Sequence, residues 1–513
     1  MRRNLFSIAI AAVCASVVLG AAAQADVTLN TLFSDNAVLQ RGVKVPVWGT
    51  AANGEAVTVT IAKQTAKATA RDGKWTAWLR PMKAGGPFTM TVQGSNRLEV
   101  KNVLIGEVWI CSGQSNMQWT LANSAGGQEE IAASADPHLR LYSVPRQATH
   151  EPIPDASSSW QVAGPETTGD FSGVAYFFGR DLRKALGVPV GLINTSYGGT
   201  PAEAWTNRAA LARIPSLKYM VDNYGKMVED YQKAITAYDQ EITTFPQKVE
   251  IAKAEGKQPP VEPKKPADPS RNPHVAGGLY NAMISPLIPY SFKGAIWYQG
   301  ESNAGRAYEY RTLFPAMIKN WRSEWKLGDF PFLFVQLAPF GTRPGRPDAT
   351  WPELREAQLM TTQNTRRTGM AVIMDYGDCA DIHPKPKEPV GGRLALAARA
   401  IAYGQKTDHT GPLYKSMKVK GSEIVLSFDR AAGGLVAKGG PLKGFTIAGA
   451  TRRFVDADAR IEGKTVVVSS PTVREPVAVR YGWSDCPEVN LFDGTGLPAS
   501  PFRTDDFKMV TKP

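Results

Sequence analysis

Short apolar runs alternate with helical patterns throughout residues 103–408. The first run, 103–111, has the length and the valine, isoleucine and tryptophan content of a buried strand. Four later apolar runs also predict buried strands, at 188–194, 293–298, 330–337 and 370–375. Helical patterns lie between and after them, among others at 313–325, 353–362 and 390–403. Such alternation is typical of a parallel sheet covered by helices, so we expect an α/β domain over 103–408.

The two ends of the chain lack this alternation and contain short runs of alternating polarity separated by turn residues. Examples are 56–61 and 88–92 near the N-terminus, and 423–428 and 477–481 near the C-terminus. Asp72-Gly73 has the composition of a hairpin turn. We therefore expect sandwich-like β modules over 26–102 and 409–513, flanking the α/β domain.

Residues 1–25 have the three parts of a secretory signal peptide. The start is basic, a short apolar core follows, and Ala23-Gln24-Ala25 forms a small-x-small cleavage site. We expect cleavage between Ala25 and Asp26, and a periplasmic or secreted protein. No later run reaches the roughly 18 apolar residues of a membrane-spanning helix, so no membrane span is expected.

An insertion is indicated by a change of composition at about residue 207. Apolar residues recur there at helical spacing, with charged residues between them, up to Ala254. The proline-rich polar stretch 256–266 then has the composition of a stiff linker. We expect residues 207–272 to form a helical hairpin, which either borders the functional site as a lid or is a surface elaboration.

The net charge does not indicate a nucleic-acid partner. The formal charge is +12, but the basic residues are spread along the chain, and the densest group lies in the proline-rich stretch. A nucleic-acid-binding surface gathers basic residues on one face with aromatic residues among them. We therefore expect no nucleic-acid partner.

Three cysteines follow the expected signal peptide: Cys111, Cys379 and Cys486. Three thiols cannot build a disulfide framework, and their spacing does not match a zinc site. We expect buried free thiols, with one disulfide as the alternative. The five histidines, at 138, 150, 274, 383 and 409, also lack ligand spacing. We therefore expect no metal and no cofactor.

Ser115 lies just beyond the first core strand, where the apolar run stops at a cluster of small and polar residues, 112–116. A serine at the end of a buried strand and ahead of a helix holds its hydroxyl at the edge of the sheet. Backbone N–H groups at the helix start can receive a developing negative charge. The alternative interpretation is that Ser115 only caps the helix.

Three further loops follow predicted core strands. They contain Gly198-Gly199, the segment 299–303 and His383. In an open α/β sheet, ligands bind outside the carboxyl ends of the strands, so we expect these loops to meet near Ser115. His383 can then accept the serine proton as a general base, although a purely structural histidine is the alternative.

The motifs in these loops resemble those of SGNH (GDSL-like) hydrolases, and more closely those of the sialate O-acetylesterase family of carbohydrate esterases. The matching segments are Gly-Gln-Ser-Asn-Met at 113–117, Tyr-Gly-Gly-Thr at 197–200, Trp-Tyr-Gln-Gly-Glu-Ser-Asn at 297–303 and Asp-Ile-His-Pro at 381–384. The ending 496–505 is also similar to the family. Four such motifs in the right order, each after a strand, span most of the core domain.

The resemblance implies a three-layer α/β/α flavodoxin-like core in which Ser115 attacks an acetyl ester on a sugar. His383 is then the base, and Asp381 orients its ring. The oxyanion hole combines the Ser115 N–H, an N–H of the Gly198-Gly199 turn and a side-chain amide, from Gln299 in preference to Asn303. Residues expected to contact the sugar are Gln114, Asn116, Tyr197, Glu301 and Arg306.

Two positions depart from the general SGNH pattern. Ser302 stands where the pattern Gly-x-Asn-Asp has its amide, which is why Gln299 is preferred for the oxyanion hole. Ala380 stands where the pattern Asp-x-x-His has its acid. Asp381 is the match within the narrower family, Asp378 is the fallback, and a dyad without an orienting carboxylate remains open.

The expected function is therefore an exported esterase that removes O-acetyl groups from an oligosaccharide or polysaccharide. Two substrate classes stay open: acetylated plant polysaccharide such as xylan or xyloglucan, and acetylated sialic acid. The carboxylate of sialic acid would need an arginine near Ser115, and Arg306 is the candidate. The competing interpretation is a non-catalytic carbohydrate-binding protein with a decayed hydrolase core.

Overall fold

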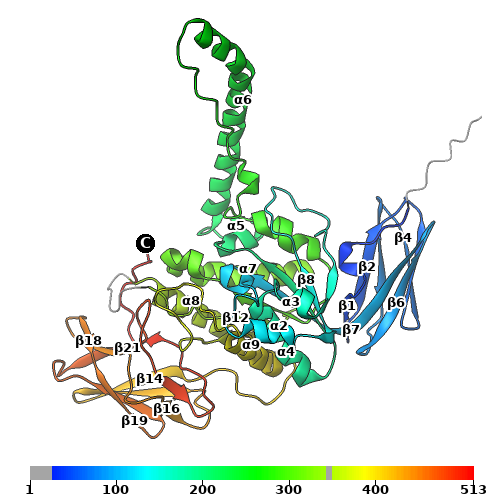
Figure 1. Ribbon diagram of the computed structural model, residues 1–513. Coiled ribbons are helices and arrows are strands. Elements are labelled where there is room, and N and C mark those ends of the chain that lie inside the picture. Colours follow the sequence, from blue (N-terminus) through cyan, green and yellow to red (C-terminus); the bar gives the residue numbers. More distant parts are fainter. Residues whose placement is uncertain (1–25, 342–348) are drawn as a thin grey trace, which may run out of the picture.

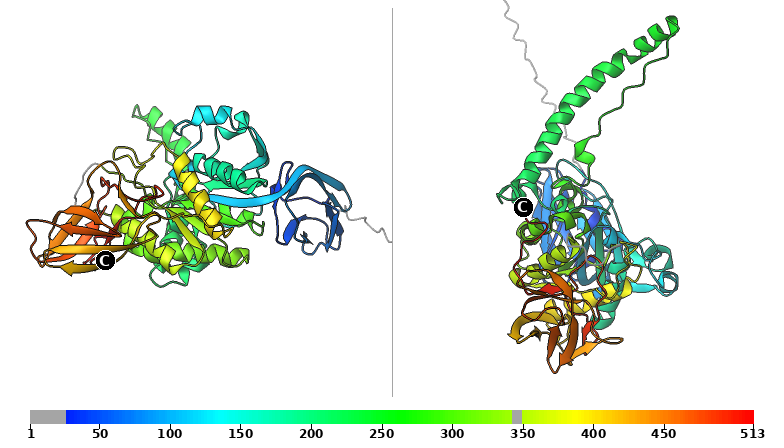
Figure 2. Two further views of the ribbon diagram at one scale, coloured as in Figure 1. Left: turned by 90° about the horizontal axis from the view of Figure 1, so that it is seen from below. Right: turned by 90° about the vertical axis from the view of Figure 1, so that its left-hand side faces the viewer.

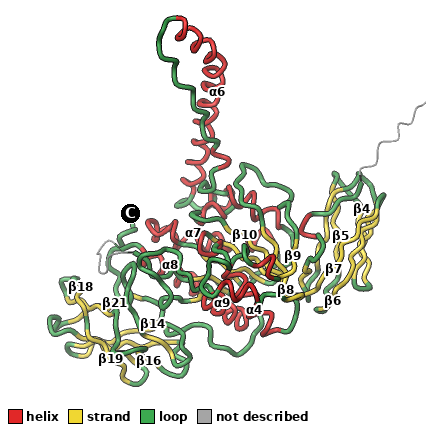
Figure 3. Tube along the Cα trace, viewed as in Figure 1, coloured by secondary structure: helices red, strands yellow, loops and turns green. Residues whose placement is uncertain are grey.

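A computed structural model describes residues 26–341 and 349–513, and Figure 1 shows its arrangement. An all-β module lies at each end of the chain, with an α/β domain between them and a helical arm projecting from that domain (Figures 1 and 3). The expected signal peptide, 1–25, lies outside the described residues.

The α/β domain is built on one sheet with the strand order β13-β12-β11-β7-β10-β8-β9. The strands are β7 (Arg97–Gly113), β8 (Asp136–Ser143), β9 (Trp160–Ala163), β10 (Val190–Ser196), β11 (Gly294–Tyr298), β12 (Phe332–Val335) and β13 (Thr368–Ala371). All neighbours are parallel except β8 and β9. The prediction of an α/β domain with a parallel sheet is confirmed.

Helices cover both faces of this sheet. Alternate side chains of the strands face opposite sides, so Trp109 packs with α4 (Gly173–Leu186) and α9 (Glu388–Ile401). Its neighbour Ile110 belongs to the opposite core, with α7 (Ala307–Trp325) and α8 (Trp351–Asn364). Strands buried on both faces explain the continuous apolar runs in the sequence.

Register places three strand ends side by side at the edge that carries the candidate site. Gly113 at the end of β7 pairs with Ser196 of β10 and with Tyr298 of β11. The loops that follow these three strands therefore leave the sheet at one level. This is the geometric reason that motifs far apart in sequence converge.

The N-terminal module shares β7 with the α/β domain. Its other strands are β1 (Val38–Gln40), β2 (Val45–Thr50), β3 (Ala56–Ile61), β4 (Gln64–Thr69), β5 (Lys74–Leu79) and β6 (Gly85–Gln93). The first part of β7 pairs with β6, and the second part, 107–113, pairs with β10. Figure 2 shows this long strand running from one unit into the other. The expected boundary at 102–103 thus falls inside a strand.

The C-terminal module contains two four-stranded sheets, ordered β14-β15-β20-β19 and β18-β17-β21-β23, around a separate apolar core. Its strands are β14 (Leu413–Lys420), β15 (Glu423–Asp429), β16 (Leu435–Ala437), β17 (Phe445–Gly449), β18 (Phe454–Asp456), β19 (Asp458–Glu462), β20 (Thr465–Ser469), β21 (Pro476–Tyr481), β22 (Leu491–Asp493) and β23 (Phe502–Arg503). The paired strands are antiparallel, as the alternating sequence pattern predicts.

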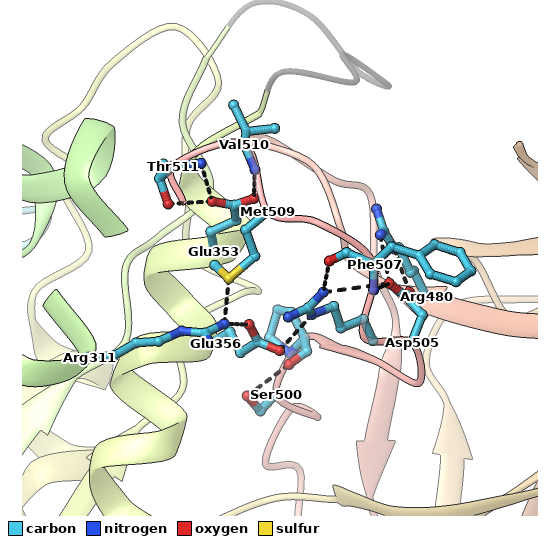
Figure 4. A network of polar contacts seen from close by, with 12 residues as sticks. Arg311, Glu353, Glu356, Arg480, Ser500, Asp505, Phe507, Met509, Val510 and Thr511 are labelled. Carbon is cyan, nitrogen blue, oxygen red and sulfur yellow. Dashed lines mark hydrogen bonds and ion pairs between the residues drawn. The ribbon is translucent and has the colours of Figure 1, made fainter. Parts of the chain in front are cut away.

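Carboxylates of α8 fasten the C-terminal module to the α/β domain (Figure 4). The Glu353 carboxylate accepts hydrogen bonds from the backbone N–H groups of Val510 and Thr511, at 2.6 and 2.9 Å. Glu356 pairs with Arg311 of α7 and, at 2.9 Å, with Arg503 of β23. These charged groups are largely buried, so their pairing holds the two units together.

A disulfide between Cys379 and Cys486 makes a second connection, and it corrects the expectation of free thiols. Cys379 lies in the loop after β13, which also carries His383, and Cys486 lies in the C-terminal module. The two cysteines meet only because the module packs against that loop, which no local sequence pattern indicates. Cys111 is free and buried, as expected.

The arm corrects the prediction of a helical hairpin. It consists of one 37-residue helix, α6 (Lys218–Ala254), and an extended chain that returns alongside it (Figure 2). Prolines at 259, 260, 263 and 266 lack the N–H groups that a second helix needs, so the return is extended. Within residues 26–341 and 349–513, no helix combines the length and apolarity that crossing a bilayer requires.

Candidate active site

Ser115 and His383 are in direct contact. Ser115 is the first residue of the short helix α1 (Ser115–Gln118), and His383 lies in the loop between β13 and α9. The Oγ of Ser115 is 2.8 Å from Nε2 of His383, although the residues are 268 positions apart. This distance is that of a hydrogen bond. Both side chains are partly exposed, so a substrate can reach them.

The tight turn before Ser115 depends on Gly113. Its φ is +142°, and a Cβ there would lie 2.1 Å from the carbonyl oxygen of Tyr298. Only glycine fits this approach of β7 to β11. Gln114 then occupies the N-cap of α1, so Ser115 is not the capping residue that the alternative interpretation assumed.

Backbone N–H groups lie beside the Ser115 hydroxyl. Because Ser115 begins α1, its own N–H has no acceptor within the helix. A Cβ on Gly198 would lie 3.3 Å from Cβ of Ser115, which shows how closely the expected glycine turn approaches. The Gly198 N–H donates to Oε1 of Gln118 at 2.7 Å, and a substrate oxygen has to displace that side chain to receive the bond. Gly199 follows with a φ of +74°.

The side-chain amides of Gln299 and Asn303 are directed elsewhere, contrary to the expectation for the oxyanion hole. Gln299 Nε2 donates to Asn303 Oδ1 at 2.6 Å, and its Oε1 accepts from the hydroxyl of Tyr310. Asn303 Nδ2 donates to Glu203 at 2.9 Å. Both side chains are buried. These hydrogen bonds join the loop after β11 to the loop after β10.

Asp381 is the carboxylate nearest to the His383 ring. Its Oδ1 is 3.7 Å from Nδ1 of His383, and it accepts a 2.8 Å hydrogen bond from the backbone N–H of His383. Asp378, the fallback, accepts from the backbone N–H of Ala380 at 2.8 Å and so shapes the loop. Asp381 therefore acts on the ring through its charge and by fixing the His383 backbone, more than through a ring hydrogen bond.

Partial burial lowers the pKa of His383 below its ordinary value. The positive charge of Lys387 lowers this pKa further, and the negative charge of Asp381 opposes both effects. The lowered pKa favours the neutral imidazole, which is the form that a general base needs. Trp119 stacks on the ring, with centroids 5.1 Å apart, and restrains its orientation.

Lys387 is a site residue that the sequence interpretation missed. It is 1% exposed, and its Nζ donates to Oδ1 of Asn116 at 2.5 Å. Asn116 Nδ2 in turn donates to Glu301 at 2.7 Å and to the carbonyl of Ile382 at 2.9 Å. This network ties α1 to the His383 loop. Burial lowers the pKa of Lys387 to about 7, against the opposing charges of Glu301 and Asp381.

Three of the expected sugar contacts have structural partners instead. Asn116 is buried in the network with Lys387. Glu301, whose carboxylate accepts from Asn116, is partly exposed, and desolvation of that carboxylate raises the pKa of Glu301. Gln114 is buried and its Oε1 accepts long bonds, of 3.4 and 3.3 Å, from the N–H groups of Gly300 and Ser302. Tyr197 remains partly exposed at the site.

Arg306, the candidate partner for a substrate carboxylate, is already neutralised. Its guanidinium pairs with Glu203 and, at 2.6 Å, with Glu309. It also donates to the Tyr219 hydroxyl at 3.2 Å. Two carboxylates therefore face one cation, and this arginine offers no free positive charge to an anionic sugar.

Comparisons with known proteins place this site in context. Residues 105–245 and 272–395 match a family model described as carbohydrate esterase, sialic acid-specific acetylesterase. A sialate O-acetylesterase from Rattus norvegicus is 34% identical over 413 residues, which cover 73% of each chain. The Homo sapiens counterpart is 32% identical and covers 73% of this chain and 70% of its own. A carbohydrate acetylesterase structure from Xanthomonas citri aligns with a TM-score of 0.80 and 38% identity, over 94% of this chain and 100% of that one.

Proposed function

Because this chain belongs to the sialic acid-specific acetylesterase family of carbohydrate esterases, and is therefore a carboxylic ester hydrolase, we propose that it removes O-acetyl groups from sugars through an acetyl-serine intermediate on Ser115. The observation that carries this proposal is the 2.8 Å contact between Ser115 Oγ and His383 Nε2. The parallel sheet with its loops at the carboxyl edge supports an SGNH-type core.

Acylation follows from this geometry. Neutral His383 takes the proton of Ser115 as Oγ attacks the acetyl carbonyl carbon, and the carbonyl oxygen becomes an oxyanion. The Ser115 N–H, and the Gly198 N–H once the Gln118 side chain is displaced from it, donate hydrogen bonds to that oxyanion. The protonated His383 then gives its proton to the sugar oxygen. The bond between that oxygen and the acetyl carbon breaks, the oxyanion becomes a carbonyl again, and the deacetylated sugar hydroxyl leaves.

Deacylation repeats the same steps with water. His383 takes a proton from a water molecule, whose oxygen attacks the acetyl group on Ser115. The proton returns to Ser115 Oγ as the bond to the acetyl carbon breaks, and acetate is released. The negative charge of Asp381 stabilises the imidazolium in both halves of the reaction, and the contact with Trp119 keeps the ring in place.

The intact site speaks against a non-catalytic carbohydrate-binding protein. Sugar binding does not require a histidine nitrogen at hydrogen-bond distance from a serine hydroxyl, with a glycine turn packed against that serine. A hydrolase core that had lost its activity would not need the serine, the histidine and the glycine turn in contact.

We propose neutral acetylated plant polysaccharide fragments, such as those of xylan or xyloglucan, as the substrate in preference to acetylated sialic acid. The reason is that Arg306 is paired with two carboxylates and cannot also receive the carboxylate of a sialic acid.

A panel of acetylated glycans tests this substrate class. Acetate release should be faster from xylan and xyloglucan fragments than from acetylated sialosides by at least about tenfold in kcat/KM, which corresponds to about 1.4 kcal/mol. Acetylated neutral monosaccharides serve as the matched small substrates. Faster release from sialosides would reject the proposed preference while leaving the esterase reaction intact.

We also propose that the protein is exported. The signal-like segment 1–25 supports this, and so does the disulfide between Cys379 and Cys486, because disulfides persist mainly in oxidising compartments.

A further inference from the structure

A cavity of about 270 Å³ lies at the foot of α6, between the arm and the α/β domain. The helix contributes Tyr219, Asn223 and Met227 to its wall, and the chain returning from the arm contributes Asn272 and His274. The volume is close to the lower end of the range for small-molecule sites, about 300–1,000 Å³.

One wall residue of this cavity, His274, lies close to the glycine turn beside Ser115. A Cβ on Gly198 would lie 3.3 Å from Cβ of Ser115, and one on Gly199 would lie 3.9 Å from Nε2 of His274. His274 lines the cavity. Ser115 and His274 of the cavity wall therefore each lie close to one of two consecutive glycines.

A second cavity, of about 370 Å³, continues along the arm. It shares Met227 and Asn272 with the first and adds Tyr231 and Pro266. Eight residues of α6 line the two cavities, and four of them, Tyr219, Asn223, Met227 and Tyr231, recur every four positions and so share one side of the helix. The two cavities adjoin at Met227 and Asn272 and follow the arm, which projects from the domain in Figures 1 and 2.

The cavities combine apolar and amide side chains with charged ones: Glu203 and Arg306, which pair with each other, line the first, and Asp230 and Asp268 line the second. Carboxylates accept hydrogen bonds from sugar hydroxyl groups and repel an anionic chain, so this lining favours an uncharged sugar chain.

Tyr219 and Met227 are large side chains that are each 41% exposed, so both can contact a bound chain. Tyr219 is held in place, because its hydroxyl donates to Glu309 at 2.6 Å. A fixed aromatic ring can stack on the C–H face of a pyranose, and Asn223 and Asn272 can bond its hydroxyl groups.

We infer that the inner side of α6 is a glycan-binding track that holds the polysaccharide chain while one of its acetyl groups is at Ser115. The inference rests on the proposed esterase function and deepens it, because it makes the arm responsible for a preference for long sugar chains. The ester and its own sugar lie at Ser115, and the neighbouring sugar units lie against Tyr219 and then Tyr231.

The test compares an acetylated xylan oligosaccharide with p-nitrophenyl acetate, which is too small to reach the arm. In Tyr219→Ala and in Tyr231→Ala, the ratio of kcat/KM on the oligosaccharide to kcat/KM on p-nitrophenyl acetate should fall about tenfold, through KM. Tyr219→Phe keeps the ring but loses the bond to Glu309, so its ratio should lie between those of Tyr219→Ala and the unaltered enzyme. Tyr238→Ala is the control, because Tyr238 lies on the same helix beyond both cavities.

A wild-type ratio in both alanine variants would overturn the inference, and so would an equal fall in Tyr238→Ala. Failure of the proposed function gives a different result. In that case Ser115→Ala would hydrolyse p-nitrophenyl acetate as fast as the unaltered enzyme, whatever the arm variants do.

Discussion

Replacing His383 with glutamine should lower kcat for the hydrolysis of p-nitrophenyl acetate by about 10⁴-fold or more. Glutamine keeps a polar side chain in the loop but cannot accept the proton of Ser115, whose Oγ lies 2.8 Å from His383 Nε2. The measurement is steady-state kcat at pH 7 to 8. His138→Gln is the control, because His138 lies on β8 and is 44% exposed.

Variants of the two nearby carboxylates should lower kcat less than His383→Gln does. Asp381→Asn should lower kcat only about tenfold, well short of the roughly 10⁴-fold loss for a carboxylate bonded directly to the ring, because 3.7 Å separates Asp381 from Nδ1. Asp378→Asn should do less still. Since the Asp381 charge raises the pKa of His383, Asp381→Asn should also move the acid limb of kcat/KM to lower pH. A wild-type kcat in His383→Gln would contradict the assigned base.

Removing the disulfide should lower the free energy of unfolding by about 4 kcal/mol. Cys379 and Cys486 close a loop with a sequence separation of 107, and a cross-link over about 100 residues is worth up to roughly 4.7 kcal/mol in the chain-entropy model. The double variant Cys379→Ser/Cys486→Ser should therefore unfold at lower urea concentration. Its kcat should also fall, by up to about tenfold, because the bond anchors the loop that carries His383.

Reduction supplies the matched control for this prediction. Dithiothreitol should shift the urea midpoint of the unaltered protein toward that of the double variant and should leave the variant where it was. Equal midpoints for the oxidised protein and the double variant would show that the connection through Glu353 and Glu356 of α8 is sufficient without the disulfide.

The sequence predicted the elements whose signals are local. Continuous apolar runs identified the strands of the parallel sheet, because strands buried on both faces need them. Small and polar residues at the strand ends identified the loops of Ser115 and His383, and the parallel order placed both at one edge. The helical content of the arm was visible in the spacing of its apolar residues.

Features set by long-range packing were missed or misjudged. Cys486 meets Cys379 only after the C-terminal module docks, so neither cysteine shows its partner in the sequence. Gln299 has the right residue type for an oxyanion hole, but the hydroxyl of Tyr310 and the amide of Asn303 bind it elsewhere. Lys387 was overlooked because lysine is almost never fully buried without a partner, and its partner Asn116 is distant in sequence.

The central claim is that Ser115 carries the acetyl group during turnover. Its most direct test is mass spectrometry of the Ser115 peptide after rapid acid quenching of the enzyme with p-nitrophenyl acetate. The account predicts one acetyl group on Ser115, and neither that acetyl group nor appreciable turnover in Ser115→Ala. Undiminished turnover in Ser115→Ala, or an acetyl group that accumulates on another residue at the catalytic rate, would contradict it.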